Sequence, residues 1–407
     1  MEKTEYLILG GGPAGVTFAS RLKEFGIEDF LVLEMESEAG GLCRSTLVDG
    51  FPLDIGGGHF LDVRRPKVNH FLFNFMPESE WDKYDRNSKI AIHNMMINHP
   101  FEANIWQMPT DEQVVYLKSI AIAGCNIGKK MPEDFIEWIH WKLGDKIAND
   151  YMIPYNQKMF GNELSELGTY WLEKLPDVSF EETLLSCLEK KAYGKQPGHA
   201  QFYYPKKYGY GELWRRMADS LDNKIHYNSQ VSVIDYTNKI VKLKNGETYQ
   251  ANYIISTIPW NSIDELFGMP EEIEKTIKHL KHSSIQIEYF NKNLETDCHW
   301  IYYPDPQLPY HRILVRSNFC PGSRGYWTET NINRVKCSET SENYKYVNQY
   351  AYPINTKNKP NIMKNLLEWN KSQNVYGLGR WGEHQHYNSD VTVEKAMSLA
   401  DSIIKKR

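Results

Sequence analysis

The sequence predicts an α/β protein whose first domain is built around a parallel sheet. An apolar run at Tyr6–Leu9 leads directly into a glycine-rich turn, Gly10–Gly15. Apolar residues with helical spacing follow at positions 16–25. A second apolar run, Phe30–Leu33, then ends at the acidic Glu34. This order of strand, glycine turn, helix, strand and acid is typical of a Rossmann-like nucleotide-binding unit.

The glycine turn has the pattern G-x-G-x-x-G, in which bare backbone lets a pyrophosphate approach the start of a helix. The last glycine of the pattern lets the helix pack closely on the strand. The residues expected along the pyrophosphate are Gly10, Gly12, Pro13, Ala14 and Gly15. Glu34 follows Gly10 by 24 residues. A carboxylate at such a distance accepts hydrogen bonds from ribose hydroxyls and repels a 2′-phosphate.

Composition excludes several classes of protein. The 407 residues are 41% hydrophobic and 24% charged, which excludes a disordered or fibrous chain. The net charge of −5 shows no excess of basic residues of the kind that binds nucleic acid. The six cysteines form no C-x-x-C pair, so we expect neither a metal site nor a disulfide framework. No apolar run is long enough to span a bilayer, and we expect a cytoplasmic protein.

The rest of the chain divides by its pattern of apolar residues. Residues 65–196 read as helices separated by proline turns. Residues 224–259 switch to short alternating strands, with Asn245–Gly246 as a hairpin turn. Residues 285–352 are strand-rich, and a final strand and glycine loop precede a helix at 391–404 with Ser389 or Asp390 as its N-cap.

We therefore expect three parts: a discontinuous nucleotide-binding domain at 1–75, 200–265 and 370–407, a helical substrate lobe at 76–199, and an antiparallel-sheet substrate domain at 266–369. Aromatic residues make up 13% of the chain and gather between positions 151 and 327. They are either core filling or the lining of a pocket for a planar or sugar ligand.

Further motifs follow the first unit, namely Gly40–Thr46 and Phe51–His59. With them the chain resembles the flavoproteins that include amine oxidases, protoporphyrinogen oxidases and UDP-galactopyranose mutases. The resemblance implies FAD as cofactor, with the paired glycines and an arginine along its diphosphate and the second glycine run near its isoalloxazine ring. Besides the residues of the first turn, it implies FAD contacts from Glu34, Gly41, Leu42, Arg44, Gly57, Gly58, His59, Val231, Gly379, Arg380, Asp390 and Val391.

Two of these residues have alternative roles, and a third is assigned on resemblance alone. His59 either contacts the flavin ring or is a structural histidine. Arg380 either neutralises an FAD phosphate or faces the ring. The backbone of Val231 is assigned to adenine on resemblance alone. The start of the last helix is expected to face the flavin, where its positive end would stabilise a reduced, anionic ring.

Among these flavoproteins the chain is most similar to the UDP-galactopyranose mutases, over nearly its whole length. The shared pieces include Tyr155–Phe160, Trp300–Pro304 and His311–Arg312. In that family the reduced flavin is the nucleophile in a sugar-ring isomerisation without net redox change. The resemblance therefore implies an isomerase of a nucleotide sugar. The alternative is an FAD-dependent oxidoreductase of the amine oxidase or protoporphyrinogen oxidase type, and a third reading is a non-catalytic flavoprotein.

The resemblance also implies substrate contacts. Arg312 matches one of two arginines that grip the pyrophosphate, and Lys174 stands where the other is expected, with one point charge instead of a planar fork. We take His59, Lys174 and Arg312 as the catalytic candidates. Substrate contacts are expected from Asn156, Lys174, Tyr302, Arg312, Tyr352 and His386.

Several of these assignments remain open. Tyr302 and Tyr352 could instead be core residues, and Asn156 could instead cap a helix. Phe319 and His386 stand where the family has tyrosines, so the ligand differs from UDP-galactose or is held differently. The expected partner is a small molecule, with a reductant such as NAD(P)H and a homo-oligomer left open.

Overall fold

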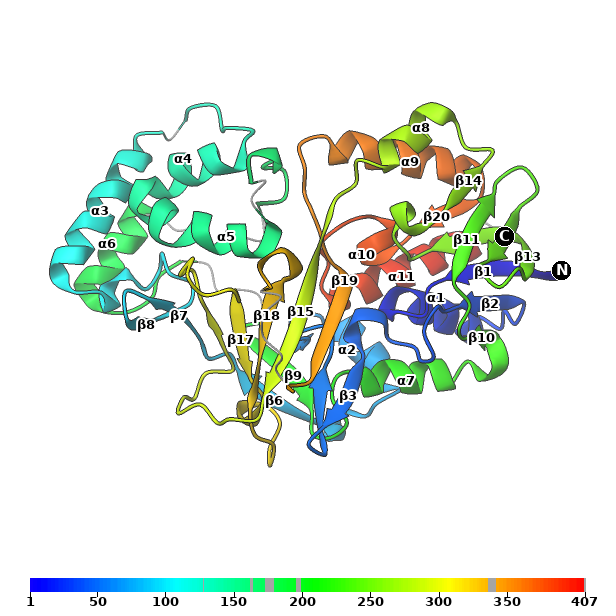
Figure 1. Ribbon diagram of the computed structural model, residues 1–407, viewed down its shortest axis with the longest axis horizontal. Coiled ribbons are helices and arrows are strands. Elements are labelled where there is room, and N and C mark those ends of the chain that lie inside the picture. Colours follow the sequence, from blue (N-terminus) through cyan, green and yellow to red (C-terminus); the bar gives the residue numbers. More distant parts are fainter. Residues whose placement is uncertain (127, 162–163, 173–178, 195–198, 336–341, 406–407) are drawn as a thin grey trace. The chain divides into compact units, whose positions relative to one another are not determined.

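The computed structural model describes residues 1–126, 128–161, 164–172, 179–194, 199–335 and 342–405 (Figure 1). They form two compact units, each assembled from separate stretches of the chain. Unit 1 comprises Met1–Asp82, Tyr203–Lys281 and Asn358–Arg407. Unit 2 comprises Lys83–Phe202 and His282–Lys357. The predicted helical lobe, from residue 83 onward, and the strands predicted at 285–352 thus belong to one unit.

Unit 1 is built on an eight-stranded sheet with a parallel centre. Its strand order is β10-β2-β1-β13-β12-β11-β14, and β20 also pairs with β13. The strands are β1 (Glu2–Leu9), β2 (Phe30–Leu33), β10 (Ile225–His226), β11 (Val231–Asp235), β12 (Ile240–Leu243), β13 (Thr248–Ser256), β14 (Glu265–Phe267) and β20 (Val375–Gly377). The parallel pairs β2-β1-β13 and the antiparallel hairpin β12-β13 confirm the predicted Rossmann-like fold and the turn at Asn245–Gly246.

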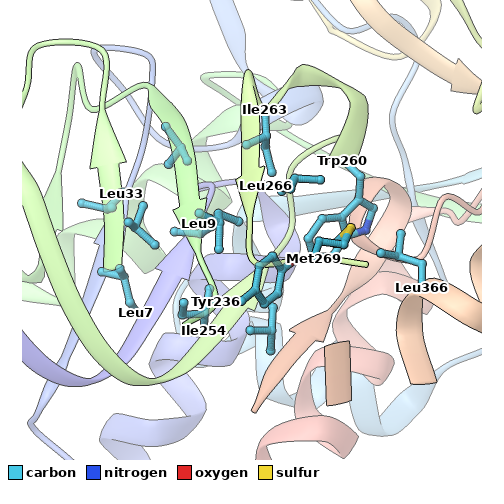
Figure 2. Close-up of a cluster of buried hydrophobic side chains, with 14 of the residues drawn as sticks. Leu7, Leu9, Leu33, Tyr236, Ile254, Trp260, Ile263, Leu266, Met269 and Leu366 are labelled. Carbon is cyan, nitrogen blue, oxygen red and sulfur yellow. The ribbon is translucent and has the colours of Figure 1, made fainter. Parts of the chain in front are cut away.

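One cluster of core residues in unit 1 lies on one face of this sheet (Figure 2). Leu7 and Leu9 of the central strand β1 are fully buried, and their alternation puts both on this face. Figure 2 shows them in one layer with Leu33 of β2 and, toward the last helices, Trp260 and Leu366. Because a central parallel strand is covered on both faces, β1 reads as a continuous apolar run.

Helices cover both faces of the sheet of unit 1. They are α1 (Pro13–Glu24), α2 (Pro66–Phe73), α7 (Gly211–Asp219), α8 (Glu271–Ile277), α9 (Lys359–Ser372), α10 (Gly379–Gly382) and α11 (Ser389–Ile404). α8 and α9 contribute Ile277 and Leu366 to the face of Leu9. α1 packs against α11, where Arg21 Nε lies 2.8 Å from Asp401 Oδ1.

Short strands complete unit 1 and link it to unit 2. The hairpin β3 (Ser45–Val48) and β4 (Phe51–Asp54) follows the turn Gly41–Cys43. A three-stranded sheet has the order β5-β9-β6, formed by β5 (Leu61–Asp62), β9 (Gln201–Pro205) and β6 (Trp81–Asp85). The chain passes between the units within β6 and β9.

Unit 2 contains a seven-stranded, largely antiparallel sheet of order β19-β15-β18-β17-β16-β7-β8. The strands are β7 (Ser88–Ile92), β8 (Met95–Asn98), β15 (His282–Phe290), β16 (Trp300–Tyr302), β17 (Arg312–Val315), β18 (Tyr326–Asn331) and β19 (Lys345–Pro353). Its helices are α3 (Thr110–Gly124), α4 (Phe135–Ile147), α5 (Ile153–Phe160) and α6 (Phe180–Glu189). A core that includes Ile90, Phe101 and Phe135 joins these helices to β7 and β8.

Two local predictions are wrong. Residues 65–196 are not all helical, because β6, β7 and β8 lie among them. β7 alternates buried and half-buried residues with the period of a strand, and the β7–β8 turn uses His93 and Asn94 at positive φ instead of a glycine. The last helix also begins before 391: it starts at Ser389, and its N-cap is Asn388 instead of Ser389 or Asp390.

The buried layer around β1 predicts a large cost for removing a side chain there. We expect Leu9→Ala to lower the free energy of unfolding by about 2–5 kcal/mol, since it leaves a cavity at a fully buried site. The matched control is Leu47→Ala, whose side chain is 68% exposed and should change stability by less than about 0.5 kcal/mol. Urea denaturation measures both, and equal effects would contradict this description of the core.

Candidate functional site

Two glycines of the turn after β1 are required by the protein's own packing. Gly10 has a φ of +102°, and a Cβ there would lie 2.5 Å from Thr257 Oγ1. A Cβ on Gly15 would lie 1.9 Å from the carbonyl oxygen of Gly10. The sharp turn and the close approach of α1 to β1, both inferred from the sequence, therefore explain these two positions.

Gly12 is different, because the protein itself leaves room for a side chain. Its φ is −75°, and a Cβ would meet the Cα of Gly41 at 3.8 Å, an ordinary contact. Gly12 is the N-cap of α1, with no side-chain cap and no acidic residue in the first turn. A ligand that approaches the backbone would require a glycine here. The turn, with Pro13 and Ala14 opening the helix, therefore fits the diphosphate of a dinucleotide.

Glu34 lies at the end of β2 beside this turn, as predicted. Its Oε2 accepts a hydrogen bond of 2.6 Å from Gly11 N–H, and its Oε1 accepts one of 2.9 Å from Glu36 N–H. Burial raises the pKa of Glu34, while the two backbone donors oppose that shift. The carboxylate keeps further acceptor positions, which is what a ribose diol needs.

The second glycine motif forms a tight turn against the first. Gly41 and Leu42 belong to the turn Gly41–Cys43, and a Cβ on Gly41 would lie 3.2 Å from the Cα of Gly12. Arg44 braces this turn, since its Nε donates to Gly41 O at 3.1 Å and its Nη1 pairs with Glu36 at 3.2 Å. Arg44 therefore lies in the region predicted for the diphosphate and is held there by the protein.

The loop with Gly57, Gly58 and His59 is anchored by a residue that sequence reasoning missed. Asp54 is completely buried and accepts hydrogen bonds from Ser45 Oγ (2.5 Å), Tyr204 Oη (3.0 Å) and Tyr210 N–H (3.1 Å). Burial raises its pKa to about 7, although these hydrogen bonds act in the opposite direction. Its place at the head of the glycine run was the available signal.

His59 lies at the end of that loop. Its Nδ1 is 3.0 Å from Gly57 O, and its ring stacks on Tyr210 with centroids 6.3 Å apart. The imidazole is partly exposed, so it remains accessible to a ligand. Val231, assigned to adenine, is the buried first residue of β11, where the register with β12 is irregular.

The C-terminal part of unit 1 supplies a second carboxylate, that of Asp390, with an acceptor position that no described residue uses. Asp390 lies in the first turn of α11, next to Val391, and its Oδ2 accepts a 2.6 Å hydrogen bond from Arg65. Its Oδ1 is buried and has no hydrogen-bond partner among the described residues. An unsatisfied buried acceptor is costly, and a polyhydroxyl chain such as ribityl would satisfy it.

Arg380 anchors the segment that precedes α11. Its Nε and Nη2 donate to the carbonyl oxygen of Tyr387 at 3.1 and 2.8 Å. Gly379 precedes it with a φ of +76°, and a Cβ there would lie 2.7 Å from the Cβ of Ala14 on α1. His386 lies in the segment that Arg380 holds and is partly exposed. Unit 1 thus brings the predicted FAD residues of three chain segments together.

The candidate substrate residues of unit 2 form a row across three strands. Tyr302 of β16 is the cross-strand partner of Arg312 on β17, and Arg312 is the partner of Glu329 on β18. Cross-strand partners share one face of a sheet. The row therefore places a phenol, a guanidinium and a carboxylate side by side, and Glu329 was not predicted from the sequence.

Glu329 holds Arg312 by one edge of its guanidinium. Nε and Nη2 of Arg312 donate to the carboxylate at 2.6–2.9 Å, whereas Nη1 has no hydrogen bond to any described residue. Burial alone would raise the pKa of Glu329, but Arg312 and His311 outweigh it and lower the pKa to about 2. Glu329 is therefore ionised at neutral pH and fixes the orientation of the Arg312 guanidinium.

The other substrate candidates differ in placement. Tyr155 packs edge-on against Tyr302, with centroids 5.5 Å apart, and Tyr352 lies at the end of β19. Asn156 is buried inside α5, where its Nδ2 donates to Met152 O at 2.7 Å, so it does not cap that helix. Phe319 is buried edge-on against Trp327. Lys174 lies outside the described residues.

Arg86 and His99 also contact this row, and sequence reasoning missed both. Arg86 Nη2 lies 3.2 Å from Tyr302 Oη and 3.0 Å from His99 Nδ1. Burial, reinforced by the charge of Arg86, holds the pKa of His99 well below its usual range. Arg86 and His99 line a cavity of about 240 Å³ within unit 2, together with Ser88, Asn98 and Asn104.

No group of three or more His, Cys, Asp or Glu side chains in the described ranges is arranged to hold a metal ion. No helix within those ranges combines the length and apolar character needed to cross a bilayer.

Comparison with known proteins identifies the relatives of this chain. A model of NAD(P)-binding Rossmann-like domains matches residues 8–75, and a model of flavin-containing amine oxidoreductases matches residues 83–286. The chain is 26% identical over 286 residues to flavin-containing amine oxidase B of Canis lupus familiaris, covering 63% of this chain and 50% of that protein. It spans about half the length of the curated relatives it matches.

Solved structures share the whole fold. A reduced UDP-galactopyranose mutase superposes with a TM-score of 0.89 at 21% identity, covering 100% of this chain and 95% of that one. A candidate protoporphyrinogen oxidase from Exiguobacterium sp. 255-15 gives a TM-score of 0.70 at 15% identity, covering 100% and 99%. The predicted resemblance to these flavoproteins is confirmed for the fold.

Gly12 provides a test of the cofactor cradle. We expect Gly12→Ala to weaken FAD binding at least about tenfold, because a methyl group would occupy the space of the diphosphate while leaving the protein's own packing intact. Fluorescence titration of the apoprotein measures affinity, and its thermal unfolding should be unchanged. Gly124→Ala, where a Cβ meets no atom within 4 Å, is the control. Unchanged FAD affinity in Gly12→Ala would contradict the cradle.

The lowered pKa of Glu329 predicts that the stability of the folded protein depends on pH. Because its pKa falls from 4.5 to about 2 on folding, its stabilisation is present above about pH 4.5 and is lost as the pH drops toward 2. We expect Glu329→Gln to cost on the order of 3 kcal/mol near neutral pH and to flatten this acid dependence. Denaturation curves between pH 2 and 7 test this, with the exposed Glu271→Gln as control. An unchanged acid limb in Glu329→Gln would refute the assignment.

Proposed function

The chain belongs to the flavin-containing amine oxidoreductase family and its cofactor is FAD, and from this premise we propose that it is a UDP-galactopyranose mutase-like enzyme that isomerises a nucleotide sugar. The observation that supports this most is the row Tyr302–Arg312–Glu329, in which one guanidinium edge is anchored and the other is left for a ligand. Such an edge suits phosphoryl oxygens, which accept two parallel hydrogen bonds.

The polarity of the surrounding groups agrees with an anionic ligand. Glu329 balances the charge of Arg312, so the charge of Arg86 is added to a row that is already neutral. His99 contributes no positive charge near neutral pH because its pKa is lowered. The cluster therefore favours a ligand with negatively charged acceptors, such as the diphosphate of a nucleotide sugar.

Each chemical task of the proposed reaction is then assigned to residues of this chain. When bound in reduced form, FAD would supply the nucleophile for the anomeric carbon of the sugar. Arg312 and Tyr302 would hold the diphosphate through its departure and return, and Glu329 would keep Arg312 in place. Tyr155 and Tyr352 would pack on the sugar or base, and His59 would contact the flavin. Lys174, Asn156 and His386 remain proposed substrate contacts.

The second candidate is net oxidation of a substrate, which the family match favours. An amine substrate is a cation with only donors at neutral pH, so it would meet Arg86 and Arg312 as like charges. An oxidation substrate that carries carboxylates would not suffer this repulsion. The two candidates are thus separated by the product formed and not by the fold.

Turnover tests the proposal directly. The holoenzyme is reduced anaerobically and given UDP-galactose, UDP-glucose and the corresponding dTDP and GDP sugars, and products are separated by chromatography. We expect a furanose product from at least one of them. No isomerised product from any, together with peroxide formation in air from an amine or tetrapyrrole, would replace the mutase proposal with the oxidase.

Substitution of Arg312 separates the contribution of its charge from that of its planar, forked shape. Arg312→Lys keeps the charge but loses the forked edge and the two-point attachment to Glu329. We expect kcat/KM for the nucleotide sugar to fall about 100-fold, with FAD content unchanged. The control is Arg334→Lys, a partly exposed arginine whose guanidinium Nη2 donates to Pro306 O. An Arg312→Lys variant with parental kcat/KM would remove Arg312 from the proposed site.

A further inference from the structure

The hydroxyl of Tyr302 receives two hydrogen bonds whose direction is unambiguous. Trp300 Nε1–H donates to Tyr302 Oη at 2.9 Å, and Arg86 Nη2–H donates to the same oxygen at 3.2 Å. Indole and guanidinium are donors only, so neither can accept a proton from the phenol. With both acceptor positions of the oxygen taken, the O–H bond of Tyr302 is left to donate elsewhere.

Both donors are themselves held in place. Arg86 Nε donates to Ser88 Oγ at 2.8 Å, and its guanidinium lies over the Trp300 ring, 5.0 Å from the centroid. His99 Nδ1, 3.0 Å from Arg86 Nη2, must accept that hydrogen bond, because guanidinium cannot. Trp300 is buried at the start of β16. The arrangement is therefore built into the fold of unit 2.

The remaining O–H of Tyr302 lies next to the edge of Arg312 that Glu329 leaves unused. Tyr302 and Arg312 are cross-strand partners, and Arg312 Nη1 has no hydrogen bond to any residue in the described part of the chain. Two donors, one neutral and one charged, are thus presented together. A phosphoryl oxygen pair can accept both, whereas an ammonium group can accept neither.

We propose that Trp300 and Arg86 are positioning residues that make Tyr302 an obligate hydrogen-bond donor, so that the ligand of unit 2 must present a phosphoryl acceptor to it. This inference rests on the proposed function for the position of the diphosphate but concerns different residues. It assigns specificity to two side chains that do not themselves bind the phosphate.

The experiment measures the binding of UDP and of inorganic pyrophosphate to the oxidised holoenzyme by calorimetry. Trp300→Phe keeps an aromatic ring but removes the N–H donor together with part of the indole, so the phenol proton of Tyr302 can rotate away from the ligand into the vacated position. We expect UDP to bind Trp300→Phe about five- to tenfold more weakly and Tyr302→Phe about tenfold or more weakly. The double variant should bind no more weakly than Tyr302→Phe, because the tryptophan acts only through the phenol.

Trp327→Phe is the matched control. Trp327 lies on β18, which β17 separates from β16; it is fully buried, and its Nε1 has no hydrogen-bond partner among the described residues. It should bind UDP within about twofold of the parent. Arg86→Lys provides a second route if Trp300→Phe folds poorly, since lysine cannot contact Ser88 and Tyr302 in the same way.

The outcomes are separable. Additive losses in the double variant, an effect of Trp300→Phe no larger than that of Trp327→Phe, or a parent that binds neither probe would overturn the inference. A parent that shows the expected coupling but isomerises no nucleotide sugar would leave the inference standing and remove the proposed function. Isomerisation of a nucleotide sugar together with additive losses in the double variant would support the proposed function and overturn the inference.

Discussion

The attachment of Arg312 to Glu329 is the interaction on which the functional account depends. A guanidinium has two edges, and the carboxylate takes Nε and Nη2 while Nη1 makes no bond within the described residues. Both charges are largely removed from water, so the pair persists only with good geometry. That geometry comes from the register of β17 and β18, which makes the two residues direct neighbours. The strands thereby fix which edge of the Arg312 guanidinium Glu329 occupies.

In unit 1, too, some features are required by the protein's own packing and others are not. Gly10 and Gly15 are dictated by the turn and by the contact of α1 with β1, whereas Gly12 is dictated by neither. The unsatisfied Oδ1 of Asp390 is another feature that the protein's own packing does not explain. Both become reasonable when a dinucleotide with a diphosphate and a polyol chain binds beside them, which is what the family of this chain requires.

The sequence predicted those features whose cause is local. The βαβ unit, the Asn245–Gly246 hairpin and Glu34 follow from apolar period, turn chemistry and spacing, and the structure has them. The hairpin β7–β8 was missed because His93 and Asn94 adopt positive φ without a glycine to signal it. Asp54, Arg86 and Glu329 were missed because their partners are distant in the sequence, and only pairing of strands brings them together. The resemblance to mutases named Arg312 and Tyr302 but not the residues that orient them.

Recognition of an anion by unit 2 is proposed to depend on donors that the fold holds fixed. Calorimetric titration of the oxidised holoenzyme with UDP-galactose, free galactose and putrescine tests it most directly, because the three ligands separate phosphate, sugar and ammonium. We expect UDP-galactose to bind, and free galactose and putrescine not to bind at comparable concentrations. Binding of putrescine with no binding of UDP-galactose would contradict it.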